Sequence, residues 1–175
     1  MVGTQATLNL WPIMEINVLI DEGLEECLEV SWLRNIAERV LVAQSAGSDV
    51  ELGLAIAGQE RVQQLNLSYL GKDEPTDVLA FSMLPEPLAT GKSEASSPFA
   101  QPPDGVLHFG EVIISYPQAV MQAEERRHSV KKEVAVLIIH GVLHLLGYDH
   151  VEPEPERQMK TREKEILNCI EGELG

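Results

Sequence analysis

Three histidines near the C-terminal end constrain this chain more than any other feature of its sequence. His140 and His144 lie four residues apart in an apolar run, followed by Gly147 and His150. Residues four apart on a helix share one face, about 6 Å apart along the axis. Gly147 can adopt the left-handed conformation that ends a helix, so that the returning chain brings His150 to the same point. The spacing therefore predicts a helix and a loop that direct three imidazoles toward one metal ion.

Three imidazole ligands are typical of a catalytic zinc site, because they leave the fourth coordination position open for water or substrate. The alternative is that these are ordinary histidines packed near a core. Unpaired polar rings among Val, Leu and Ile side chains would be costly, which favours the metal. Asp149 is expected either to orient a histidine ring or to cap the loop.

The residue after His140 argues against a peptidase. The ligand spacing is similar to that of the metzincin proteases, which place a glutamate directly after the first histidine as the general base. Here that residue is Gly141, which has no side chain. A glycine within a helix costs about 1 kcal/mol relative to alanine. We expect either the close approach of a strand or substrate to the metal at Gly141, or simple tight packing of the helix.

Composition limits the class of protein and its partners. The formal net charge is −15, whereas a protein that binds nucleic acid unaided usually has a basic face. This charge argues against tight autonomous binding, but it leaves room for a local basic cleft or for delivery to RNA by a protein partner. The two cysteines, Cys27 and Cys169, are predicted to be core residues in a reducing cytosol. No segment has the length of a membrane span or the pattern of a signal peptide.

Hydrophobic periodicity predicts an α+β fold with a small four-stranded mixed sheet packed with about five helices. Residues 1–13 are expected to be a flexible extension, with Met14 as an alternative start, and the Pro/Ser/Gly-rich segment 84–106 a mobile loop between two strands. The strands are predicted over 15–20, 50–57, 76–81 and 108–115. The helices are predicted over 30–46, 59–69, 117–127 and 130–146, with a last helix after the Glu/Pro run at 152–156.

Two polar groups of residues could serve the predicted site. A basic cluster contains Arg126, Arg127, Lys131 and Lys132. Lys132 lies about 12 Å along the helix from His140, within reach of neighbouring phosphates on a bound strand. A solvated charged face is the favoured interpretation of this cluster, because charged residues are mostly exposed. A second group, Lys72, Asp73, Thr76 and Asp77, becomes relevant only if the fold brings it beside the metal.

Three stretches of the sequence form a characteristic set. The first is the histidine motif at 140–150, which includes Gly147-Tyr148-Asp149. The second is the block at 65–81, which reads LNLSYLGKDEPTDVLAF, and the third is Gly110-Glu111-Val112-Ile113-Ile114. Together they resemble the YbeY family of bacterial endoribonucleases, also called rRNA maturation factors, and the resemblance spans about residues 14–170.

This resemblance implies a zincin-like fold for a single metal-dependent hydrolase domain at 14–175. It implies one Zn²⁺ ion held by His140, His144 and His150. The implied activity is single-strand-specific endoribonuclease cleavage in 3′-end maturation of small-subunit rRNA and in ribosome quality control. The implied partners are an rRNA precursor and the ribosomal small subunit with its proteins, in the cytoplasm.

One departure from the family pattern affects the expected activity. The family usually has an arginine directly after the tyrosine of the second block, and this chain has Leu70. Leucine cannot bind a phosphate, so we expect Lys72 or the basic cluster to take that role. Two alternatives to a nuclease remain open: an assembly factor with a structural zinc, and a metalloprotease, which Gly141 disfavours. Metal-assisted hydrolysis by water and metal activation of the RNA 2′-hydroxyl both remain open as mechanisms.

Overall fold

The computed structural model describes residues 14–46, 49–84, 105–148 and 153–174. Its elements follow the predicted order of strands and helices. The strands are β1 (Met14–Ile20), β2 (Val50–Ala57), β3 (Val78–Ser82) and β4 (Leu107–Ser115). The helices are α1 (Val30–Ala43), α2 (Gln59–Leu70), α3 (Tyr116–Arg126), α4 (Val130–Leu145) and α5 (Pro153–Ile170), followed by a short 3-10 helix (Glu171–Glu173).

The four strands form one mixed sheet in the order β1-β2-β4-β3. The β1–β2 and β2–β4 pairs are parallel, whereas β3 runs antiparallel to β4 and forms an edge of the sheet. The predicted mixed sheet is therefore confirmed, and β3 and β4 form a hairpin with a long connection. Most of the predicted loop, residues 85–104, lies outside the described residues, as does the predicted extension at 1–13.

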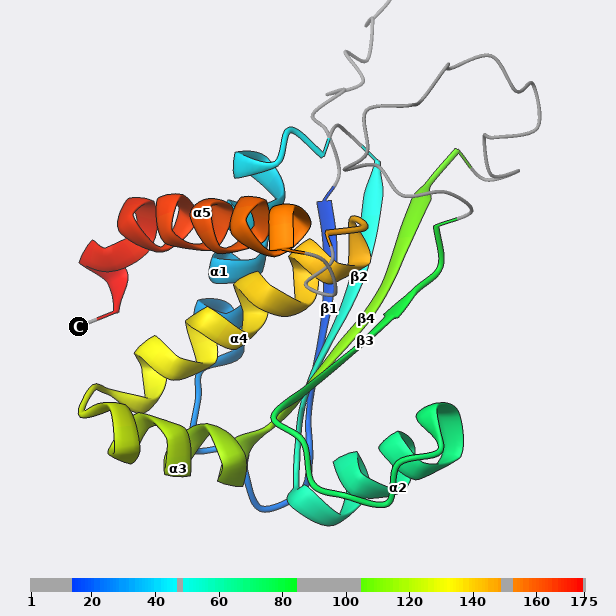
Figure 1. The fold of residues 1–175 in the computed structure, drawn as a ribbon, viewed down its shortest axis with the longest axis vertical. Coiled ribbons are helices and arrows are strands. Elements are labelled where there is room, and N and C mark those ends of the chain that lie inside the picture. Colours follow the sequence, from blue (N-terminus) through cyan, green and yellow to red (C-terminus); the bar gives the residue numbers. More distant parts are fainter. Residues whose placement is uncertain (1–13, 47–48, 85–104, 149–152, 175) are drawn as a thin grey trace, which may run out of the picture.

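The two faces of the sheet are covered unequally. Successive side chains of a strand point to opposite faces, so Val112 and Ile114 of β4 belong to the main core and Ile113 to a smaller cluster. Figure 1 shows α3, α4 and α5 on one side of the sheet and α2 beyond the other side. Helix α4 is buried along most of its length, because helices α1 and α5 cover it from one side and the sheet from the other.

Local chemistry explains where the elements differ from prediction. Helix α1 ends at Ala43, before the predicted 46, because Gln44 caps it and Ser45 has a positive φ of 53°. Strand β3 begins at Val78, whose N–H is bound by the Asp77 side chain at 2.8 Å. These are shifts of boundaries, and the predicted elements themselves are present.

The predicted burial of the two cysteines is wrong, because Cys27 and Cys169 are both exposed. Helix α5 turns Met159, Ile166 and Ile170 toward the core. Cys169 lies on a different face from these residues, since consecutive residues are about 100° apart around a helix. Among the described residues, no helix has the length and apolar character needed to cross a membrane.

Candidate metal centre

Helix α4 carries the first two histidines, and both of its ends are fixed by capping. The side chain of Ser129 accepts a hydrogen bond from the Lys132 N–H at 3.1 Å and so caps the start of the helix. At the other end Gly147 has a φ of 97°. Its N–H donates to His144 O at 3.0 Å, and the Tyr148 N–H donates to Leu143 O at 3.1 Å. These two bonds form a Schellman motif, so Gly147 ends the helix in the predicted left-handed conformation.

The structure brings His140 and His144 together. Their Nε2 atoms lie 3.0 Å apart, and their rings meet edge to face with centroids 4.5 Å apart. Both side chains are half-buried. Two imidazole nitrogens this close can both bind one ion when neither of them carries a proton.

Glu163 of α5 lies behind His140. Its Oε1 is 2.5 Å from His140 Nδ1. With the Nδ1 proton donated to this carboxylate, the tautomer leaves Nε2 as an acceptor. Histidines that bind metals commonly donate their other ring N–H to a carboxylate in this way. Glu163 was not predicted from the sequence, because it is 23 residues from His140 on a helix whose packing against α4 no local pattern predicts.

The pair of imidazoles fits a tetrahedral metal. Zinc–nitrogen bonds of about 2.0–2.1 Å place two such ligands about 3.3 Å apart, close to the 3.0 Å between these two nitrogens. Within the described part of the chain, no three His, Cys, Asp or Glu side chains are arranged to hold a metal. The other two residues expected at this site, Asp149 and His150, lie outside the described residues.

The histidines open onto a pocket of about 340 Å³ between α4, the end of α2 and the edge strand β3. The fold therefore brings members of the second polar group, Lys72, Asp73, Thr76 and Asp77, beside the predicted metal site, which was the condition for their relevance. Lys72, Thr76 and Asp77 line the pocket, whereas Asp73 instead accepts a hydrogen bond from Gln63. The described residues that line the pocket are Asn66, Leu70, Lys72, Glu74, Thr76, Asp77, Val78, Leu79, Ala80, His140, Gly141 and His144.

The connection between α2 and β3 is held in place by its own hydrogen bonds. Gly71 ends α2 with a φ of 70°. The buried Asn66 side chain donates to the Glu74 carbonyl at 2.9 Å. Asp77 is bound through both carboxylate oxygens, to the Val78 N–H and to the Gln122 side chain at 3.0 Å. Lys72 is therefore carried by an ordered connection at the rim of the pocket.

The free edge of β3 also faces this pocket. Hydrogen bonds from Ser115 N–H to Asp77 O and from Met83 N–H to Phe109 O mark the two ends of its ladder with β4. Bonded pairs alternate along antiparallel strands, so the odd-numbered residues of β3 bond to β4 and the even-numbered residues direct their peptide groups outward. Ala80 is even-numbered and lines the pocket. Its N–H therefore points away from β4, and within the described strands it has no partner in the sheet.

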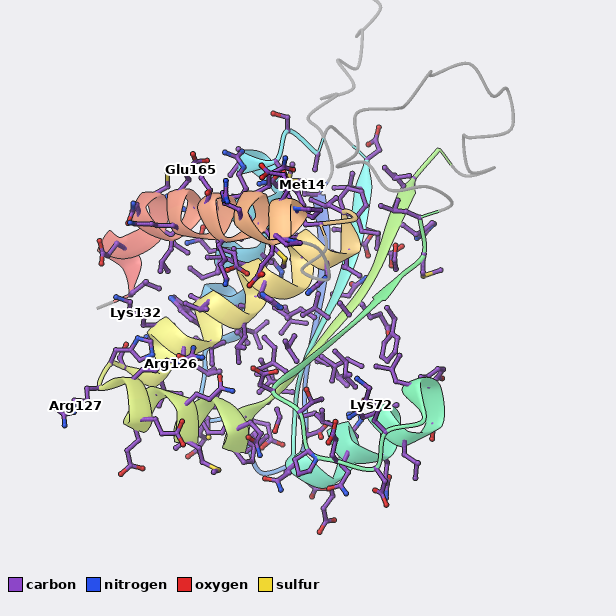
Figure 2. All side chains as sticks on the ribbon, in the orientation of Figure 1. Met14, Lys72, Arg126, Arg127, Lys132 and Glu165 are labelled. Atoms are coloured by element: carbon purple, nitrogen blue, oxygen red, sulfur yellow. The ribbon has the colours of Figure 1, made fainter. Side chains whose placement is uncertain are left out.

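The basic cluster predicted at 126–132 is not among the residues that line the pocket. Figure 2 shows Lys72 beside α2, and Arg126, Arg127 and Lys132 on the opposite side of the sheet in this view. Three of the four cations make contacts within the chain. Arg126 binds the fully buried Glu133 at 2.6 Å, Lys131 lies over the Trp32 ring at 5.5 Å, and Lys132 pairs with Glu171 at 3.7 Å.

Gly141 is explained by close packing of α4 on the sheet. A Cβ atom at this position would lie 2.5 Å from Val112 Cγ1 and 3.3 Å from Val78 Cγ2. These atoms belong to β4 and β3, so the helix approaches the strands more closely than any side chain would allow. Of the two expected explanations, the structure favours tight packing against the strands.

Comparisons with known proteins agree on one family. A family model described as endoribonuclease YbeY matches residues 21–171. A Dehalococcoides mccartyi protein with that name is 50% identical over 160 residues, covering 90% of each chain. A Bacillus cereus protein with the same name is 38% identical over 159 residues, covering 89% of this chain and 97% of its own. In fold, the chain is similar to the solution structure of a Thermotoga maritima protein, with a TM-score of 0.59, 24% identity and 90% of each chain covered. The chain therefore belongs to the YbeY endoribonuclease family.

Proposed function

We propose that this chain is a zinc-dependent endoribonuclease that cleaves single-stranded RNA. We place it in 3′-end maturation of small-subunit rRNA and in ribosome quality control, with the ribosomal small subunit and its proteins as partners in the cytoplasm. The family and the name endoribonuclease carried by its relatives support a hydrolase that acts on RNA. The proposal treats residues 14–175 as a single metal-dependent hydrolase domain.

The observation that carries this proposal is the pair of converging nitrogens on His140 and His144, 3.0 Å apart. We assign these two residues and His150 as the metal ligands. When bound by three imidazoles, zinc supplies Lewis-acid activation of water and of a phosphoryl oxygen. Glu163 supports the assignment, because its carboxylate holds the proton on His140 Nδ1 and keeps Nε2 available as a ligand.

The chain's own residues can hold the scissile phosphate beside these ligands. The Lys72 ammonium and the Ala80 N–H are the cation and the edge-strand donor at the pocket. A cation and a peptide N–H that meet a phosphoryl oxygen form charge-assisted hydrogen bonds. Both carboxylate oxygens of Asp77 accept hydrogen bonds, from the Val78 N–H and from the Gln122 side chain, so we assign Asp77 a structural role. We assign phosphate binding to Lys72 and Ala80. Asn66 and Gly71 have a positioning role, because they hold the connection that carries Lys72.

The structure gives a physical reason against the protease alternative. A peptidase of this ligand pattern needs a glutamate at position 141. Even the first atom of that side chain would lie 2.5 Å from Val112 Cγ1. The close packing of α4 on β4 therefore excludes the base that peptide hydrolysis requires.

A ribosome assembly factor with a structural zinc and little intrinsic activity is the second candidate. It is favoured by Leu70, which lines the pocket where the family usually has an arginine and whose side chain is 55% exposed. An uncharged side chain there contributes nothing to phosphate binding. In this case the zinc would stabilise the fold, and cleavage would depend on a partner.

Cleavage of single-stranded RNA by purified wild-type protein, His144→Ala and Leu70→Arg separates these candidates. We expect cleavage by wild type, its loss in His144→Ala and after chelation, and faster cleavage by Leu70→Arg. Activity in Leu70→Arg alone would indicate a chain that depends on a partner. No cleavage by any variant, with a melting temperature that falls on zinc removal, would support the assembly factor. Products ending in a 2′,3′-cyclic phosphate would reject attack by water.

A further inference from the structure

Exposed apolar side chains gather beside the candidate metal centre. Eight large apolar side chains of the described residues are exposed, and four of them lie between residues 67 and 83. We call three of these four, Tyr69, Leu70 and Met83, together with the half-buried Phe81, the apolar rim. Its members come from the end of α2 and from β3 with the residue that follows it. An exposed apolar surface of this kind beside a pocket commonly marks a binding site.

Tyr69 and Phe81 form the centre of the apolar rim. Their ring centroids are 5.0 Å apart and their planes are tilted by 51°. Phe81 is half-buried in the small cluster between α2 and the sheet. Tyr69 is 69% exposed in spite of this contact. One aromatic ring is therefore fixed by the fold and supports a second ring, most of which is open to solvent.

The apolar rim is continuous with the pocket of the metal centre. Leu70 follows Tyr69 in sequence and Ala80 precedes Phe81, and both Leu70 and Ala80 line that pocket. A strand whose phosphate lies against the Ala80 N–H would therefore reach Tyr69 by crossing the edge of β3.

Charge indicates which part of a nucleotide fits the apolar rim. Phe81 is paired with the exposed Glu111 across the ladder with β4. A phosphate beside this carboxylate would be repelled, whereas an uncharged base would not. In addition, Lys72 is the one Lys or Arg among the described residues that line the pocket. A chain with a net charge of −15 needs a contribution to RNA binding that does not depend on charge.

We propose that Tyr69, supported by Phe81, is a stacking platform for an unpaired base of single-stranded RNA whose phosphate lies in the pocket of His140 and His144. This inference rests on the proposed function and names a residue that holds its substrate. Every base has a π face, so such a platform accepts any sequence but requires an unpaired strand. The preference for single strands would then come from Tyr69, because a base within a duplex is covered by its neighbours.

The test compares wild type, Tyr69→Ala, Tyr69→Phe and Met121→Ala in cleavage and in binding of a short fluorescent single-stranded RNA. Loss of one stacked base weakens binding about 5- to 150-fold. We expect Tyr69→Ala to raise KM and Kd by such a factor with little change in kcat and an unchanged salt slope. Tyr69→Phe should retain wild-type binding. Met121→Ala is the matched control, since Met121 is an exposed apolar residue of α3, outside the apolar rim.

RNA with single abasic sites gives a readout that a purely structural role of Tyr69 would not change. RNA with one abasic position should bind wild type more weakly, by the same factor by which Tyr69→Ala weakens binding of intact RNA. The same abasic position should not weaken binding to Tyr69→Ala any further. Equal KM for wild type and Tyr69→Ala, or equal abasic penalties in both proteins, would overturn the platform while leaving the nuclease intact. RNA binding that survives while a protein partner's binding is lost would assign the apolar rim to that partner. A wild-type chain that neither binds nor cleaves RNA would overturn both proposals.

Discussion

Gly141→Ala tests the packing that places the histidines beside the sheet. The added methyl group would lie 2.5 Å and 3.1 Å from the two Cγ atoms of Val112 and 3.3 Å from Val78 Cγ2. Val112 is fully buried, and β-branched side chains are stiff at χ1. The clash therefore cannot be relieved by a rotation of Val112, and α4 must move away from β4.

The size of the effect follows from two opposing terms. Overpacking of a close-packed core costs about 1–3 kcal/mol, and a contact of 2.5 Å belongs to the upper part of that range, about 2–3 kcal/mol. Replacing glycine by alanine within a helix returns about 1 kcal/mol. We expect a net loss of about 1–2 kcal/mol in the free energy of unfolding. For a chain of this length that corresponds to a fall in Tm of about 2–8 °C. Because α4 carries His140 and His144, RNA cleavage should fall as well.

Urea unfolding at a fixed zinc concentration measures this loss, since bound metal shifts the apparent stability. Gly172→Ala is the matched control, because a Cβ atom at Gly172 meets nothing within 4 Å. The free energy of unfolding of Gly172→Ala should stay within about 0.5 kcal/mol of the wild-type value. Val112→Ala in the Gly141→Ala background removes the clashing atoms, so the double variant should lose less stability than the sum of the two single losses. A Gly141→Ala protein as stable as wild type, or additive losses, would refute the packing argument.

Three further substitutions test the site and the frame around it. Glu163→Gln should lower zinc affinity about 10- to 100-fold in a chelator competition, because His140 loses its carboxylate partner. Lys72→Gln should weaken RNA binding and reduce the salt slope by about 0.7, the value for one phosphate contact on a single strand. Glu133→Ala should cost about 2–4 kcal/mol in urea unfolding, since the buried Glu133 binds Arg126 at 2.6 Å and accepts a second charge-assisted bond.

The substitutions at Glu163 and Lys72 each have a control in the same chain. Glu165 lies two residues from Glu163 and pairs with Arg162 at the surface, so Glu165→Gln should leave zinc affinity and stability unchanged. Lys132→Gln, outside the pocket lining, should change RNA binding less than Lys72→Gln does. Equal effects of the paired substitutions would contradict the roles assigned to Glu163 and Lys72. A loss below about 1 kcal/mol in Glu133→Ala would show that the buried pair is dispensable.

Features that depend on local chemistry could be predicted from the sequence. The histidine helix begins after Ser129 and ends before Gly147, because capping satisfies backbone groups within a few residues. The separation of four residues predicted that His140 and His144 share one face, because the geometry of an α-helix is fixed. Alternating apolar residues gave the strands, and the mixed sheet followed from their order along the chain. The family motif covered the same residues, so the metal ligands could be proposed before any tertiary contact was known.

The surroundings of those proposed ligands depend on contacts between elements that are distant in sequence. Pairing of β3 at the edge of the sheet brings Lys72 and Leu70 beside a helix about 70 residues away in sequence. The packing of α5 on α4 places Glu163 behind His140, and the hairpin of β3 and β4 carries Phe81 under Tyr69. The physical reason is the same in each case. These contacts arise from the burial of apolar faces on one another, and that packing fixes the positions of polar neighbours that share no local pattern.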